Sequence, residues 1–241
     1  MRQDWYQRWG KRTLDVVLGT ALALIAIPLI IVFAIGSAIA FRAWPIFVHR
    51  RTSRFGRPFP FPKIRSLPAN APRAADKYVI LLGVEQNRWS RFLRKTHLDE
   101  LPQLFLVPFG RLSLVGPRPE MPELADKYPT SFAVSRTRVR PGCTGLWQIS
   151  QASRGLIPEN PQYDESYVAN VSLRLDLWVL VRSLRVLLGA PKIELETVPN
   201  SLVPAQPVPR TVSREAPVPM FDEPRPRETT SPRDRVGTTN R

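Results

Sequence analysis

The chain has 241 residues, with 35 Lys and Arg against 20 Asp and Glu, which gives a net charge of +15. Its single cysteine, Cys143, excludes an intrachain disulfide framework and a zinc cluster built from cysteines. The two histidines, His49 and His97, do not favour a multi-histidine metal site. Because 26 prolines are too many for one compact helical fold, part of the chain is expected to lie outside the folded unit.

An uncharged run of 26 residues extends from Val16 to Phe41. A spanning helix needs about 20 apolar residues, whereas a secretory signal has an apolar stretch of only about 7–15. Pro28 lies mid-run and predicts a break or kink. Cytoplasmic flanks are the basic ones, and both flanks are basic here: Arg8, Lys11 and Arg12 before, and Arg42, Arg50, Arg51 and Arg54 after. We therefore expect a re-entrant hairpin, and a tilted spanning helix stays open.

Two later segments have basic amphipathic patterns. In 171–189, three arginines fall on one helical face of an otherwise apolar helix that should stop at Gly189. Such a helix suits the membrane interface, and a core helix with a solvated arginine stripe is the alternative. Asp176 falls on the opposite side and is expected to have a polar partner. In 86–95, a basic face opposes Trp89 and its apolar neighbours, and that basic face is either solvated or directed towards anions.

Residues 190–241 hold ten of the 26 prolines and nearly balanced charges, eight basic and seven acidic. This composition predicts a disordered tail, because it buries too little apolar surface to offset the entropy of ordering. The positive charge then belongs to residues 1–189. In a chain with a membrane segment, that charge favours anionic lipid over nucleic acid as the partner.

The run from Arg94 to Glu120 carries the chemistry. Pro102 is tolerated only in the first turn of a helix, so a helix is predicted to begin close to Asp99. Asp99 and Glu100 would then lie at a helix N-terminus, which keeps carboxylates ionised. An Asp-Glu pair at this position is more often structural than catalytic.

A proline on each side of Arg118 predicts a stiff, extended mount for its guanidinium. Such a guanidinium suits bidentate recognition of phosphate, and a surface turn is the alternative. Further on, Gly142 and Gly145 predict a tight loop or a close approach of two backbones. Cys143 between them is interpreted as a small apolar filler.

These segments, in this order and spacing, resemble the bacterial sugar transferases, the small monotopic phosphoglycosyl transferases of the exopolysaccharide type. The resemblance covers about three quarters of the chain, from Lys11 to about Leu188. The motifs that carry it are KRTLD (11–15), PIFVHRRTSRFGRPF (45–59), KIRSL (63–67), LRKTHLDELPQL (93–104), GRLSLVGPRPE (110–120), RPGCTGLWQ (140–148) and YDESYVANVSLRLDL (163–177).

The resemblance implies a mainly α fold with minor β structure (α+β), namely a re-entrant membrane helix followed by a cytosol-facing catalytic domain with interfacial amphipathic helices. The expected divisions are an N-terminal flank and membrane helix in 1–46, the catalytic domain in 47–189 and the tail in 190–241. The expected location is the cytoplasmic face of the bacterial inner membrane. The expected partners are a UDP-sugar, undecaprenyl phosphate and anionic lipids, without nucleic acid, and a homodimer is left open.

The implied reaction transfers a sugar-1-phosphate from the UDP-sugar to undecaprenyl phosphate and releases UMP, with Mg²⁺ and a covalent aspartyl intermediate. On the family pattern Asp99 is the nucleophile and Glu100 assists, and both carboxylates hold the metal. The basic residues that match the family's phosphate and nucleotide contacts are Arg94, Arg118, Lys63 and Arg65.

The chain departs from the family pattern at His49, Ser53, Leu106 and Arg111. These departures leave one alternative open, a membrane-tethered scaffold or regulator of polysaccharide synthesis without catalytic activity. A membrane-anchored nucleic-acid binder is disfavoured, because the aromatic residues alternate with aliphatic ones in apolar faces rather than forming a surface for stacking bases.

Overall fold

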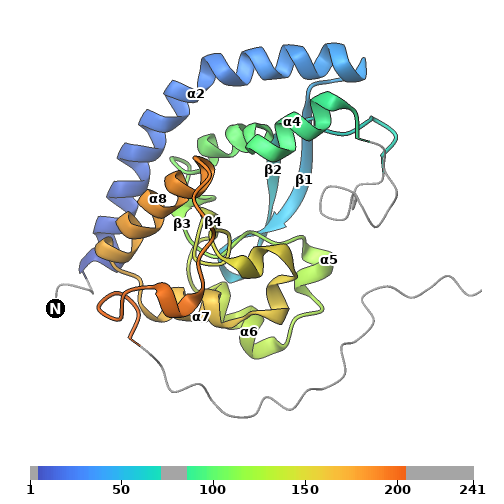
Figure 1. The fold of residues 1–241 in the computed structure, drawn as a ribbon. Coiled ribbons are helices and arrows are strands. Elements are labelled where there is room, and N and C mark those ends of the chain that lie inside the picture. The colour runs from blue at the N-terminus through green and yellow to red at the C-terminus, as the bar shows by residue number, and fades with distance from the viewer. Residues whose placement is uncertain (1–4, 72–85, 205–241) are drawn as a thin grey trace, which may run out of the picture. The chain divides into compact units, whose positions relative to one another are not determined.

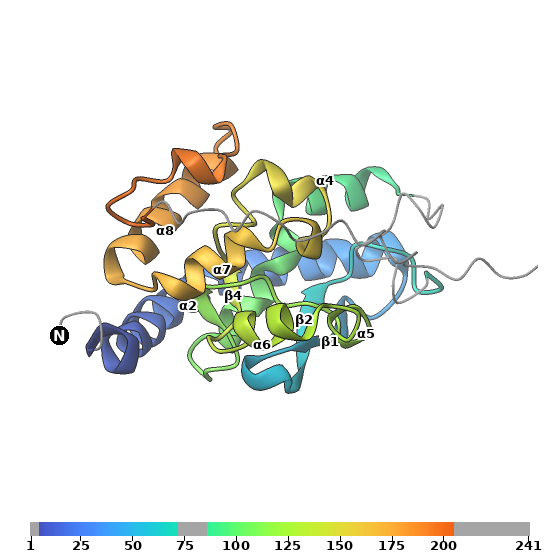
Figure 2. The ribbon, with the colours of Figure 1, turned by 90° about the horizontal axis from the view of Figure 1, so that it is seen from below.

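The computed structural model describes residues 5–71 and 86–204. In these residues the fold is mainly helical, with four short strands in two separate pairs, which confirms the predicted α+β class. Figure 1 shows one long N-terminal helix that runs along two sides of a smaller folded body. In Figure 1, α6 (Thr130–Arg136) and α7 (Gln162–Ala169) lie on the side of that body away from the long helix, and the view from below in Figure 2 has them in front.

The long helix, α2, spans Lys11–Phe41 and follows a π-helical turn over Tyr6–Gly10. It is apolar and long enough to cross a membrane, and most of its large apolar side chains are exposed. Pro28 lies inside the helix rather than ending it. Figure 1 shows that α2 is bent, as expected for a helix with an internal proline. The predicted break is thus a bend within a continuous helix.

Both ends of α2 are attached to the same folded body. Near its start, the buried Asp15 carboxylate accepts a hydrogen bond from the backbone N–H of Leu114 at 2.9 Å. Near its end, the hydroxyl of Ser37 donates to the carbonyl oxygen of Arg65. The helix therefore arches over the body with contacts at each end (Figure 1).

Strands β1 (Ile46–Thr52) and β2 (Pro58–Ile64) form an antiparallel pair in which Ile46 lies opposite Ile64. Three prolines in β2 donate no hydrogen bonds, which is tolerated because each strand of a two-stranded sheet has a free edge. The end of β2 places Lys63 inside the body, where its side chain is buried.

Strands β3 (Ser113–Val115) and β4 (Gly142–Thr144) are parallel, with Ser113 opposite Gly142. A Cβ on Gly142 would lie 2.1 Å from the backbone nitrogen of Gly116, and one on Gly145 would lie 2.2 Å from the carbonyl oxygen of Gly116. Both distances are far shorter than a van der Waals contact. The close backbone approach that the sequence predicts at Gly142 and Gly145 is confirmed.

We expect Gly142→Ala to lower the free energy of unfolding by about 3 kcal/mol, because the added methyl group must displace backbone rather than side-chain atoms. Thermal unfolding of the purified protein in detergent measures this effect. Gly56→Asn is the matched control, since Gly56 lies in open space with a positive φ that asparagine also adopts. An alanine variant at 142 as stable as the control would contradict the close contact.

The helices around the strands enclose a single core of apolar side chains. α4 (Arg88–Thr96) lies beneath the C-terminal half of α2, where the ring of Trp89 lies 6.1 Å from that of Phe33. The short helix α5 spans Pro122–Ala125, and α8 spans Leu173–Leu187. α8 buries Leu175 and Val179 completely but leaves a second apolar stripe exposed at positions 173, 177, 181, 184 and 188.

Residues 190–204 belong to the folded body, so the expectation that disorder begins at residue 190 is wrong for this stretch. Ile193, Val198 and Val203 are buried in the core. Gln151 and Ile193 also share a backbone hydrogen bond of 2.9 Å. The high proline content predicted disorder, but the segment also contains these apolar residues at intervals of five, and their burial stabilises it. The rest of the predicted tail, 205–241, lies outside the described residues.

Candidate active site

The two sequence-predicted carboxylates lie at the junction of α4 and the next helix. His97, with a left-handed φ of 56°, separates α4 from a 3₁₀ helix over Leu98–Leu106. Asp99 and Glu100 occupy its first turn, which confirms their predicted position. The helix is 3₁₀ rather than α because an α-helix would place the ring of Pro102 against the carbonyl of Leu98.

Asp99 is almost fully buried, with 3% of its surface exposed. The hydroxyl of Ser66, which follows β2, donates to Asp99 Oδ2 at 3.3 Å. This hydrogen bond fixes one carboxylate oxygen and supports its charge.

Two cationic side chains contact the same carboxylate oxygen of Glu100. Lys63 Nζ lies 3.0 Å from Glu100 Oε1, and Arg118 Nη2 lies 3.5 Å from the same atom. Burial raises the pKa of the Glu100 carboxyl, but the charges of Lys63 and Arg118 outweigh burial and hold the pKa well below its usual range. Glu100 is therefore ionised at neutral pH.

The structure brings together Lys63, Arg118 and Glu100 from three separate segments: the end of β2, the loop after β3, and the start of the 3₁₀ helix that also carries Asp99. Arg94 is half-buried in the last turn of α4, on the segment that leads into Asp99. Arg65 has a different contact: its Nε donates to the carbonyl oxygen of Trp44 at 2.7 Å. Its predicted role as a phosphate ligand stays a prediction.

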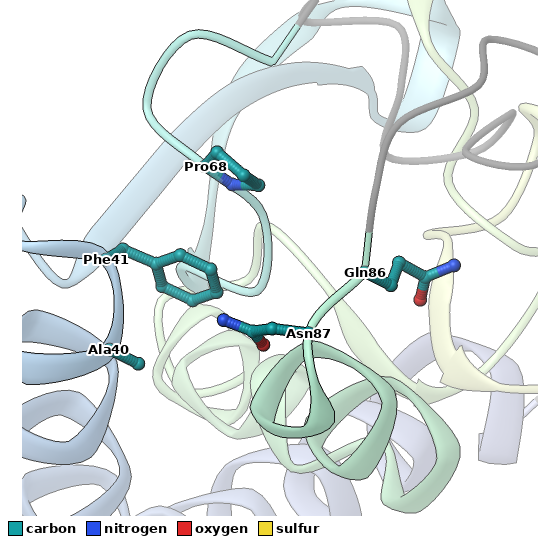
Figure 3. Close-up of a pocket in the computed structure, with 5 residues that line it drawn as sticks. All are labelled: Ala40, Phe41, Pro68, Gln86 and Asn87. Atoms are coloured by element: carbon teal, nitrogen blue, oxygen red, sulfur yellow. The ribbon is translucent and has the colours of Figure 1, made fainter.

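A cavity of about 430 Å³ adjoins this cluster and is lined by Lys63, Arg65 and Ser66, together with residues 46–48 and apolar residues of the following loop. It is large enough for part of a nucleotide sugar. A second, more open pocket of about 490 Å³ lies between the end of α2 and the start of α4 (Figure 3). There Phe41 and Asn87 face each other, and the lining contains none of the sequence-predicted site residues.

The carboxylates fit a shared magnesium site rather than a site made by the protein alone. Within residues 5–71 and 86–204, no three His, Cys, Asp or Glu side chains gather in a group that could hold a metal ion. Asp99 and Glu100 provide two hard oxygen ligands. Mg²⁺ is usually bound by one or two carboxylates plus substrate phosphates, so the donor set is suitable once a diphosphate is present.

Sequence reasoning missed the contacts that hold these groups in place. Ser66 lies within the KIRSL motif (63–67), but no pattern assigned it to Asp99, because the two residues are 33 positions apart. Cys143 behaves as the predicted filler: burial raises the pKa of its thiol to about 12, so the thiolate is absent at neutral pH. Two of the departing residues contact each other, with Ser53 Oγ donating to the carbonyl oxygen of Arg111 at 3.2 Å.

The arrangement is suited to nucleophilic chemistry on a phosphate. A buried carboxylate lies next to an ionised neighbour whose two cations could turn to phosphate oxygens. Those cations would reduce the repulsion between a carboxylate and an anionic substrate, and would stabilise the charge that develops during transfer. Carboxylates are established nucleophiles in group transfer.

Comparisons with known proteins agree with the motifs. An undecaprenyl-phosphate galactose phosphotransferase of Salmonella typhimurium is 32% identical over 197 residues, covering 75% of this chain and 41% of that protein. The UDP-galactose-lipid carrier transferase of Erwinia amylovora is 32% identical over 201 residues, again covering 75% of this chain and 41% of the relative. The chain thus spans about two fifths of the length of these relatives.

A shorter relative is covered over most of its length. The exopolysaccharide production protein ExoY of Sinorhizobium fredii is 32% identical over 191 residues, which is 73% of this chain and 84% of that protein. The family profile described as bacterial sugar transferase matches residues 6–190, a range that includes α2 and every residue of the site described above. The chain belongs to the bacterial sugar transferase family.

Proposed function

We propose that the protein transfers a sugar-1-phosphate from a UDP-sugar to undecaprenyl phosphate at the cytoplasmic face of the bacterial inner membrane. The observation that carries the proposal is the buried Asp99 carboxylate beside Glu100, whose charge is balanced by Lys63 and Arg118. The names of two relatives, a galactose phosphotransferase and a lipid-carrier transferase, support the same reaction class. The reaction would be the first membrane step in the synthesis of an exopolysaccharide or other glycoconjugate.

In the proposed mechanism, an Asp99 oxygen attacks the phosphorus atom that carries the sugar. The bond from that phosphorus to the bridging oxygen breaks, and UMP leaves with the electron pair. A phosphate oxygen of undecaprenyl phosphate then attacks the same phosphorus, and Asp99 leaves as a free carboxylate. Two displacements at one phosphorus replace a single difficult transfer.

The other residues bind and orient the anionic groups. Lys63 and Arg118 exchange part of their contact with Glu100 for phosphate oxygens, and Arg94 and Arg65 are the further proposed phosphate ligands. Glu100 keeps both cations in place when the substrate is absent. With the diphosphate bound, Asp99 and Glu100 would hold Mg²⁺, which neutralises phosphate charge.

We also propose that α2 enters the membrane and returns to the same side. Its 31 residues would be about 46 Å long if straight, enough to cross a bilayer. Yet Asp15 near its start and Ser37 near its end both bond to the body that carries the active site. A spanning helix would place these contacts on opposite membrane faces. Single cysteines at positions 9 and 44, with Cys143 replaced, should both stay unlabelled by an impermeant maleimide added outside intact spheroplasts.

The exposed apolar stripe of α8 supports an interfacial position for that helix. Leu184 and Leu188 are 58% and 79% exposed. A core-helix interpretation explains Leu175 and Val179, but not this second stripe. We propose that the stripe contacts lipid, with Arg174 and Arg185 near anionic headgroups.

UMP release tests the proposed function. Purified protein in nanodiscs receives Mg²⁺, undecaprenyl phosphate and a panel of UDP-sugars that includes UDP-galactose. We expect release with at least one donor, and its loss when EDTA removes the divalent cation. A folded, membrane-inserted protein that releases UMP from no donor would contradict the proposal and favour the scaffold alternative.

A further inference from the structure

We propose that Arg136, held by Asp164, is a positioning residue that fixes the backbone from which Arg118 reaches the active site. The inference rests on the proposed function, because it takes Arg118 as a ligand of the transferred or leaving phosphate. Neither Arg136 nor Asp164 belongs to the cluster around Asp99, so their proposed effect on the reaction is indirect, through the backbone of Arg118.

The loop that carries Arg118 has few donors of its own. Pro117 and Pro119 flank Arg118, and neither has a backbone N–H. The carbonyl oxygen of Arg118 instead accepts a hydrogen bond from Arg136 Nη2 at 2.7 Å. A side chain of α6 therefore holds the same residue whose guanidinium lies 3.5 Å from Glu100.

Arg136 is itself held rigidly. It is 5% exposed, and its Nε and Nη2 lie 3.0 Å and 2.9 Å from Asp164 Oδ2 in the first turn of α7. Its guanidinium also packs against two neighbouring aromatic rings, 5.4 Å from the ring centre of Tyr128 and 5.6 Å from that of Phe132. A planar guanidinium fixed in this way can donate to Asp164 and to the loop carbonyl at once, which a lysine ammonium does poorly.

Stability alone does not require this pair. Replacing a buried ion pair by apolar residues of similar volume is often neutral or stabilising. Such a replacement keeps α6 packed on α7 but removes the hydrogen bond from Arg136 to the carbonyl oxygen of Arg118. It therefore separates a structural role of the pair from a positioning role.

The experiment compares the double variant Arg136→Met/Asp164→Leu with the unmodified protein. If the pair positions Arg118, the variant should unfold within a few degrees of the unmodified protein, but kcat/KM for UMP release should fall by about 100-fold, the typical effect of a small misplacement of a reacting or binding group. Arg136→Lys, which keeps the positive charge, is a second variant. Its kcat/KM should lie between that of the unmodified protein and that of the double variant. Arg54→Lys is the control, since Arg54 also donates to a main-chain carbonyl, that of Arg138 at 2.8 Å, but on the exposed turn between β1 and β2.

Arg118→Ala completes a double-mutant cycle. If Arg136 acts through Arg118, the Met/Leu replacement should change kcat/KM by no more than about twofold in the Arg118→Ala background. The equilibrium affinity of the same four proteins for the UDP-sugar gives a second double-mutant cycle that does not depend on turnover.

Two results would overturn the inference: a stable Met/Leu variant with unchanged kcat/KM and affinity, or an equal loss with and without Arg118. If that double variant does not fold, the same two criteria apply to Arg136→Lys. Failure of the proposed function is distinct, because the unmodified protein would then release no UMP.

Discussion

Asp99→Asn is expected to reduce UMP release by more than about 1,000-fold, because an amide is a far weaker nucleophile than a carboxylate and removal of a nucleophile is among the largest single losses in enzymes. The fold should be retained, since asparagine matches the shape of the buried carboxylate and still accepts the hydrogen bond from Ser66. The rate of UMP release in nanodiscs measures the loss.

A trapping experiment separates a nucleophile from a general base. When a donor labelled in the sugar phosphate is supplied without undecaprenyl phosphate, the unmodified protein should retain covalent label and the Asp99→Asn protein should retain none. Ser66→Ala should retain label but react roughly 10- to 100-fold more slowly, because a hydrogen bond to a charged group contributes about 1.5–3 kcal/mol. Glu165→Gln, an exposed carboxylate also in the first turn of a helix, serves as the control. Normal UMP release by Asp99→Asn would contradict the covalent mechanism.

Local rules predicted the parts of the site that depend on neighbouring residues. Pro102 predicted that Asp99 and Glu100 lie in the first turn of a helix. Gly142 and Gly145 predicted a tight loop or a close backbone approach, and the structure has the close approach, to Gly116. The buried Asp176 has the polar partner expected for it, because Lys11 lies 2.7 Å from its carboxylate. These features follow from backbone sterics and from the penalty for burying an unpaired charge.

The sequence did not predict contacts between distant segments. The two basic residues of the KIRSL motif have different partners: Lys63, within β2, lies beside Glu100, whereas Arg65, directly after β2, donates to the carbonyl oxygen of Trp44. The folded conformation of residues 190–204 also depends on packing against the core. The average composition of the segment does not predict which of its residues are buried. The hydrogen bond from Arg136 to Arg118 joins α6 to a loop, and no sequence periodicity marks such a contact.

Asp176→Asn is expected to lower the free energy of unfolding by about 3–5 kcal/mol, because it leaves the ammonium of Lys11 without its buried counter-ion. Asp176 is fully buried and accepts hydrogen bonds from Tyr6 at 2.6 Å, Lys11 at 2.7 Å and Tyr167 at 2.8 Å. For a folded unit of this size the change corresponds to a melting temperature lower by about 10 °C. Thermal unfolding in detergent measures it, with the exposed Asp126→Asn as the control.

This network also joins α2 to the candidate active site. Lys11 Nζ donates to the carbonyl oxygen of Val115 at 2.9 Å, and the hydroxyl of Tyr167 lies 2.9 Å from the same oxygen. Val115 directly precedes the loop that carries Arg118. Lys11→Met should therefore lower both stability and the rate of UMP release. In combination with Asp176→Asn its effect on stability should be clearly less than additive, because both changes disrupt one ion pair. Strictly additive effects would show that Lys11 and Asp176 act independently, and an unchanged rate of UMP release in Lys11→Met would remove the link between α2 and the position of Arg118.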